Sequence, residues 1–200
     1  MADRVDNQLL LESGLELMRQ NGKPLTRQPG FGRSMRYAMA NGETVRIRTC
    51  NDHVLIVLAD DVDPDKAALN IDGTDWLLIV MPEVQRTAGK VLAYLVPTPV
   101  AVEASRRSHR DWLNSNPNTR GGNTTFNLWF DEGGVSAGFA QHWKQYLLPG
   151  TAEMKATTAN TVSSGCNIKD VVDAARQMIA TTAGVPIAAV KITVDFGATA

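Results

Sequence analysis

The sequence has few cysteines and no long apolar segment, and each absence argues against a class of protein. Its 200 residues include two cysteines, Cys50 and Cys166, which is too few for a small disulfide-stapled scaffold. Two free thiols in a reducing cytosol are the simpler interpretation, and one disulfide is the alternative. The longest apolar runs, 54–58 and 76–81, are strand-sized and far shorter than the ~20 residues that span a bilayer.

The N-terminal residues lack the charged-then-apolar pattern of a secretory leader. Together with the absence of an apolar span, this predicts a cytoplasmic protein without a membrane partner. Hydrophobic residues make up 44% of the chain and charged residues 20%, which are values typical of a globular protein. A chain of this length can bury a core without a metal or disulfide staple.

Hydrophobic periodicity predicts an α/β (α+β) protein in which helices flank a mixed β-sheet. Alternation or short apolar runs predict strands, and spacing of i, i+4, i+7 predicts helices. The unbroken apolar run 54–59 further predicts a central strand that is covered on both faces. The expected helices are 7–20, 100–113, 135–148 and 167–184, and the expected strands are 44–49, 54–59, 76–81, 90–96, 125–130 and 190–196.

The composition predicts one main domain with a C-terminal appendage. Residues 1–150 are expected to form the main α/β domain. Residues 151–166 are small and polar, which is typical of a flexible linker. Residues 167–200 are expected to form a helix-strand unit that packs on the main domain.

The near-neutral net charge of −1 conceals blocks of opposite sign. Residues 19–48 carry seven basic groups and one acid, residues 52–83 eight acids and one base, and residues 86–120 six basic groups and two acids. Two interpretations remain open. The blocks neutralise one another within the fold, or the basic ones form a face that meets a polyanion.

Patterns that hold a metal or a cofactor are absent from the sequence, so neither is predicted. The three histidines have no ligand at i+3 or i+4, and no phosphate loop or nucleophile elbow is present. The acidic segment 60–65 alternates like a calcium loop. However, Lys66 stands where such a loop needs glycine, and Asp72 stands where it needs a bidentate glutamate.

Four stretches follow one another between residues 44 and 113. They are VRIRT at 45–49, DWLLIV at 75–80, YLVP at 94–97, and a helix from Val100. Their order and spacing resemble the restriction-endonuclease-like (PD-(D/E)XK) superfamily. In that family a strand ends in an acidic or glutamine residue, any residue, lysine and threonine. An aspartate then leads into an apolar strand, and a further strand ends in Tyr-x-x-Pro before a helix.

The resemblance implies a scaffold that cleaves nucleic acid with magnesium, but two positions depart from it. Arg46 stands at the acidic or glutamine position and Arg48 at the lysine position. Residues 25–43 also supply no metal-binding aspartate. Such catalysis needs carboxylates to hold the cation, and a guanidinium group repels one. The departures imply that cleavage is lost and that a basic face remains.

Three hypotheses of function follow. The first is a non-catalytic protein that binds DNA or RNA through Arg46, Arg48, Arg106, Arg107 and Arg110, with Arg120 at the rim. The alternative is a protein-interaction module (an inhibitor, adaptor or assembly subunit) that binds a protein partner or a second copy through the acidic segment 60–75 or the C-terminal unit. A third hypothesis is an unrecognised enzyme that uses His53, Asp72, Asp75 and His142.

Overall fold

The computed structural model describes residues 4–29, 36–118, 123–154, 172–173, 175–177, 179–180 and 185–192. The chain divides into two units, Met1–Ala156 and Thr157–Ala200. The elements of the first unit are α1 (Asn7–Gln20), β1 (Thr26–Arg27), β2 (Arg36–Ala38), β3 (Thr44–Thr49), β4 (Val54–Leu58), β5 (Trp76–Pro82), β6 (Lys90–Pro97), α2 (Thr98–Ser115), β7 (Thr125–Trp129), α3 (Phe139–His142), η1 (Lys144–Tyr146) and β8 (Ala152–Glu153).

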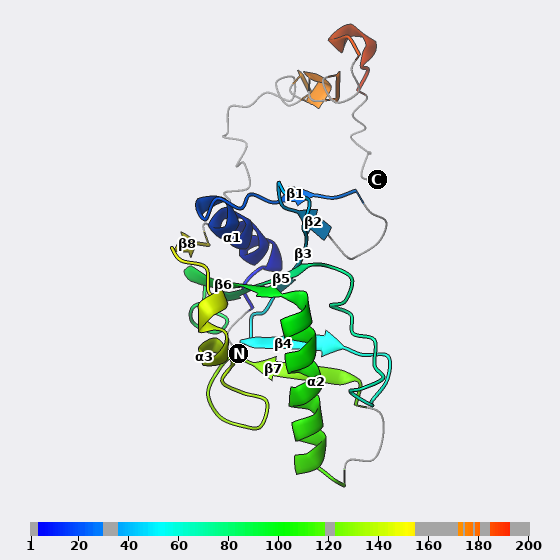
Figure 1. Cartoon of the computed structure of the whole chain (residues 1–200). Coiled ribbons are helices and arrows are strands. Elements are labelled where there is room, and N and C mark those ends of the chain that lie inside the picture. The colour runs from blue at the N-terminus through cyan, green and yellow to red at the C-terminus, as the bar shows by residue number, and fades with distance from the viewer. Residues whose placement is uncertain are drawn as a thin grey trace, which may run out of the picture. The chain divides into compact units, whose positions relative to one another are not determined.

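A six-stranded sheet in the order β1-β2-β3-β5-β6-β8 forms the centre of the first unit (Figure 1). The pair β3–β5 is parallel and the other pairs are antiparallel, so the sheet is mixed, as the sequence predicts. Residues of β5 alternate between the two faces. Leu78 and Val80 belong to one buried cluster, and Leu77 and Ile79 belong to another.

Helix α1 covers one face of this sheet. Its N-cap Asp6 accepts a hydrogen bond from the backbone N–H of Gln8 at 2.8 Å, which satisfies one free donor of the first turn. Leu10, Leu17 and Met18 are fully buried on the side that faces the sheet. Residues 7–20 were predicted to be helical, and this prediction is confirmed.

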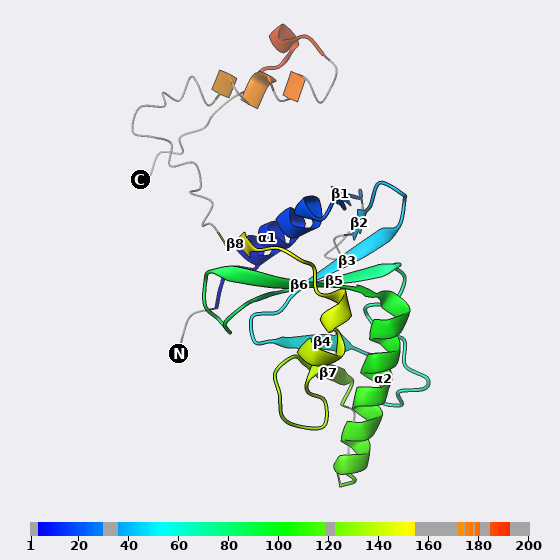
Figure 2. The same ribbon diagram turned by 60° about the vertical axis from the view of Figure 1, so that its left-hand side comes forward.

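The opposite face of the sheet is covered by α2 and by a separate antiparallel pair, β4–β7 (Figure 2). Leu55 and Val57 of β4 and Phe126 and Leu128 of β7 point into this second core and are almost completely buried. Helix α2 packs beside β7, where Ser108 Oγ donates a hydrogen bond of 3.1 Å to the backbone oxygen of Asn127.

The prediction that 54–59 forms a central strand is wrong. Strand β4 pairs with β7 alone, and one face of this pair is open. Ile56 is 51% exposed and Leu58 is 52% exposed, while Leu55 and Val57 between them are buried. The apolar run therefore reflects one buried face and one exposed apolar face.

The helix expected at 135–148 is much shorter. Gly138 has a left-handed φ of 78° and caps the four-residue helix α3. A 3₁₀ turn, Lys144–Tyr146, follows it, and the first residues of the expected helix belong to a loop. The aromatic residues of this segment still pack together, because the ring centroids of Phe139 and Trp143 lie 5.0 Å apart within the second core.

The boundary between the units lies later than the composition indicates. Residues 151–154, expected to begin the linker, belong to the first unit: β8 pairs with β6 and Met154 is buried. The rest of the expected linker, 155–166, lies outside the described residues.

In the second unit the described residues between 172 and 180 are helical, which agrees with the predicted helix. Residues 187–189 form the 3₁₀ turn η2 (Ile187–Ala189). Residues 190–192 are not in a strand, contrary to the prediction, and 193–196 lie outside the described part. The packing of this unit on the main domain stays a prediction. No helix in the described ranges is long and apolar enough to cross a membrane.

Candidate functional site

Two arginines lie directly opposite each other on neighbouring strands. Arg36 of β2 is in register with Arg46 of β3, and the flanking pair Tyr37 and Val45 is buried against α1. Because strand side chains alternate, Arg36 and Arg46 project to the other face of the sheet. Arg48, two residues further along β3, projects to the same face. We call Arg36, Arg46 and Arg48 the arginine cluster.

The cluster is electrostatically unfavourable. Burial lowers the pKa of Arg46, and the positive charges of Arg48 and Arg36 lower it further, with a smaller opposing effect from Asp72. Burial also lowers the pKa of Arg48. The buried Nε atoms of Arg46 and Arg48 have no hydrogen-bond partner.

The cluster also has little compensation nearby. Among the described residues, no carboxylate forms an ion pair with Arg36, Arg46 or Arg48. Arg48 Nη2 lies 3.5 Å from the backbone oxygen of Asn70. A contact of this length is at the limit for a hydrogen bond.

The acidic loop, residues 60–75, connects β4 to β5 and uses its carboxylates to hold its own backbone. Asp60, Asp61, Asp63 and Asp72 each accept a hydrogen bond from a backbone N–H within the loop, at 2.7–3.0 Å. Such bonds are typical of aspartate-rich turns. Lys66 and the backbone N–H of Asp65 hold the pKa of Asp63 below its usual value.

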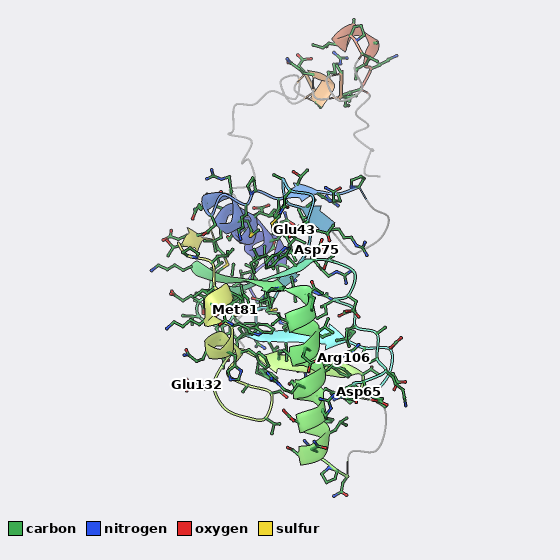
Figure 3. The ribbon with its side chains drawn as sticks, in the orientation of Figure 1. Glu43, Asp65, Asp75, Met81, Arg106 and Glu132 are labelled. Atoms are coloured by element: carbon green, nitrogen blue, oxygen red, sulfur yellow. The ribbon has the colours of Figure 1, made fainter. Side chains whose placement is uncertain are left out.

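Two of the arginines on α2 bind this loop. Arg106 Nη2 donates to the backbone oxygen of Ala67 at 3.0 Å, and Arg110 Nη2 pairs with Asp65 Oδ1 at 2.6 Å. Figure 3 shows Arg106 and Asp65 on the same side of α2. Here the basic and acidic blocks neutralise each other within the fold, one of the two interpretations left open by the sequence.

The six arginines predicted to contact nucleic acid are thus divided. Arg46 and Arg48 lie together on β3, and Arg106 and Arg110 face the acidic loop. Arg107 is exposed and lines a shallow depression with Glu103 and Trp143. Arg120 lies outside the described residues.

Sequence reasoning missed Arg36 as a member of the site. The available signal in the sequence was Gly42, a residue typical of tight turns. In the structure Gly42 has a left-handed φ of 87° and lies in the turn between β2 and β3, which pair as a hairpin. Extending that hairpin by its register places residue 36 opposite residue 46. The short length of β2 concealed this pairing.

The structure gives the members of the hypothetical enzyme site separate partners. His53 Nδ1 lies 2.8 Å from Asp131 Oδ1, and its Nε2 lies 2.6 Å from the backbone oxygen of Pro82. Asp75 accepts hydrogen bonds from the backbone N–H and the hydroxyl of Thr44, both at 2.7 Å. His142 packs its ring against Phe139.

Cys50 also has no geometry for nucleophilic chemistry. Its thiol is free and buried, at 6% exposure. Burial raises the pKa of the Cys50 thiol to about 12, so the reactive thiolate is scarce at neutral pH. Within the described ranges, no three histidine, cysteine, aspartate or glutamate side chains gather to hold a metal.

Comparisons with known proteins found no matching family model, no matching curated protein and no matching solved structure. The arginine cluster is therefore interpreted from its own geometry, and the restriction-endonuclease-like resemblance stays a prediction.

Proposed function

We propose that the protein binds nucleic acid without cleaving it, and that the arginine cluster contacts the phosphates. The observation that carries the proposal is the opposition of Arg36 and Arg46 across β2 and β3, with Arg48 beside them. Like charges directly opposite each other in a sheet destabilise it. A phosphate backbone would supply the negative charge that these groups lack.

Guanidinium chemistry supports a phosphate ligand. The planar fork of arginine matches phosphate oxygens with two parallel hydrogen bonds, and these charge-assisted bonds are stronger than neutral ones. The Nε atoms of Arg46 and Arg48 are buried, so the phosphate contacts would come from the terminal Nη groups. The proposed site differs from the predicted one, because Arg36 joins it and the loop-bound Arg106 and Arg110 leave it.

Absence of cleavage follows from the charge at the same positions. Phosphodiester hydrolysis assisted by a divalent cation needs oxygen ligands for the cation. In the resembling nucleases such a ligand would stand where this chain has Arg46, and the lysine where it has Arg48. Arg46 and Arg48 place positive charge there, which repels a divalent cation.

Fluorescence anisotropy with labelled single-stranded and duplex DNA tests the proposal. Three phosphate contacts predict that log K falls against log salt with a slope of about −3 on duplex DNA and about −2 on single strands. The DNA should remain intact on a gel after incubation with manganese. Absence of binding at low salt would contradict the proposal, and cut DNA would contradict its non-catalytic part.

A different observation favours the alternative hypothesis, a protein-interaction module. Ile56, Leu58 and Trp129 lie on the open face of the β4–β7 pair and are 51%, 52% and 42% exposed. Clustered exposed apolar side chains are typical of interaction surfaces. If this face binds a second copy of the chain, sedimentation will show a dimer that Leu58→Ser dissociates. A monomer at all concentrations would contradict self-association.

A further inference from the structure

The outward side of the β4–β7 pair presents three large apolar side chains. Ile56 and Leu58 alternate along β4 with buried residues, and Trp129 lies directly opposite Val54 on β7. Because side chains alternate along a strand, all three point away from the second core, and all three are exposed. We call Ile56, Leu58 and Trp129 the apolar face. Contiguous exposed apolar residues of this kind mark interaction surfaces.

A recess of about 230 Å³ adjoins the apolar face at Trp129. It lies between β7, α2 and residues 133–136, and its lining includes Trp112 and Asn127. None of the lining residues is an aspartate, glutamate, lysine or arginine. The recess is smaller than ordinary small-molecule pockets, so it suits one uncharged side chain of a protein partner. Side chains anchored in such recesses carry much of the binding energy at protein interfaces.

The edges of the β4–β7 pair leave little room for an added strand. At β7 the backbone oxygen of Asn127 accepts a hydrogen bond from Ser108, and the N–H of Trp129 donates to the loop that follows. At β4 the N–H and the C=O of Leu58 both bond to Asn70. Strand addition needs a free edge, so a partner is better placed across the apolar face.

Both ends of the apolar face are acidic. The strands are antiparallel, so Asp60 and Asp61 follow β4 at one end and Glu132 follows β7 at the other. Figure 3 shows Glu132 and Asp65 of the acidic loop at opposite ends of the pair. Asp60, Asp61 and Glu132 are exposed, and none of them forms an ion pair with another described residue. The apolar face is therefore complementary to positive charge at both ends.

We infer, on the protein-interaction hypothesis and independently of the arginine cluster, that the apolar face binds an amphipathic helix of another protein with basic residues at both ends. A five-residue strand is about 17 Å long, which about three helical turns span. A helix packs on a sheet through one apolar stripe. A second copy of the chain fits less well, because aligned sheets would place carboxylates against carboxylates in either orientation.

Fluorescence anisotropy with a labelled helical peptide of about 12 residues measures this binding by the full chain. Leucines at i, i+3, i+4 and i+7 form the apolar stripe of the peptide, and lysines occupy both ends. We expect saturable binding, and at least about tenfold weaker binding when glutamates replace the lysines. Scattering the same leucines around the helix should weaken binding by a similar factor. Leu58→Ser should weaken the lysine peptide about tenfold, because it removes apolar surface at the centre of the contact.

A charge variant tests the acidic ends separately from the apolar contact. Glu132→Gln should weaken the lysine peptide about two- to fivefold at low salt. Glu153→Gln, which removes an exposed carboxylate from β8, is the matched control and should leave binding unchanged. Four results would overturn the inference: no saturable binding up to millimolar peptide, equal affinity for the lysine and glutamate peptides, full binding by Leu58→Ser, or a dimer in sedimentation that excludes the peptide. The DNA titration of the arginine cluster is a separate measurement, so either proposal can fail alone.

Discussion

Arg36 and Arg46 are paired residues of the antiparallel strands β2 and β3, so the fold holds two guanidinium groups side by side. Arg48 adds a third positive charge on the same face, and its electrostatic effect on the pKa of Arg46 is larger than that of Arg36. Natural proteins commonly keep locally unfavourable arrangements where function requires them. We therefore expect that a substitution in the cluster that stabilises the free protein will weaken the proposed binding.

Removing one charge from the cluster should stabilise the free protein. Arg36→Gln relieves the repulsion across the strands and should raise the free energy of unfolding by a few tenths to about 1 kcal/mol. Urea denaturation measures this change. Arg107→Gln, which removes an exposed arginine from α2, serves as the matched control and should leave stability unchanged. A destabilised Arg36→Gln would mean that this side chain holds the sheet together.

The two arginines that bind the acidic loop should contribute unequally to stability. Arg106→Gln removes the donor to the Ala67 carbonyl and should lower the free energy of unfolding by about 1 kcal/mol. Arg110→Gln should change it by about 0.5 kcal/mol or less, because both partners of its ion pair are substantially exposed. The same urea experiment compares them. An equal or larger loss from Arg110→Gln would contradict the description of this contact as an exposed pair.

Gly14 of α1 allows the helix to approach β5 closely. A Cβ at this position would lie 2.4 Å from Cγ2 of Val80, which is a steric overlap. In a solvent-exposed helix, replacing glycine by alanine raises the free energy of unfolding by about 1 kcal/mol. For Gly14→Ala we expect the opposite sign, because overpacking should lower the free energy of unfolding by about 1–3 kcal/mol. In a double-mutant cycle, Gly14→Ala/Val80→Ala should lose less free energy of unfolding than the sum of the two single variants. Additive losses would show that Val80 is not the obstacle.

His109 should lower the free energy of unfolding as the pH becomes acidic. Burial lowers its pKa in the folded state, so the unfolded chain binds the proton more tightly. The contribution of the neutral ring is complete above the ordinary histidine pKa of about 6.5, and it is lost as the pH falls from there through the lower pKa of the folded state. Denaturation at neutral and mildly acidic pH should show a smaller decline for His109→Phe than for the wild type. An equal decline in both proteins would contradict this assignment.

Local patterns in the sequence were sufficient to predict α1, α2 and five of the strands. Their apolar positions recur with clear periods, as in Val45 and Ile47 of β3, and the structure buries the α1 side of that strand. The same local patterns did not show which faces are covered. Ile56 and Leu58 read as core residues in the sequence, but β4 lies in a separate two-stranded pair whose second face is open.

The candidate site was only partly predictable, because it depends on contacts between distant segments. Arg46 and Arg48 could be identified as neighbours on one face of a strand. The sequence could not show that Arg110 pairs with Asp65, 45 residues earlier, since that contact depends on how the acidic loop passes α2.

Comparison of duplex DNA binding by Arg36→Gln/Arg46→Gln and by Arg107→Gln tests the central claim most directly. Both proteins are measured against the wild type over a range of salt concentrations. The arginine cluster predicts that the double variant flattens the slope of log K against log salt by about 2, and that Arg107→Gln leaves it unchanged. An unchanged slope in the double variant, with Arg107→Gln weakened instead, would contradict the assignment of nucleic-acid binding to the cluster.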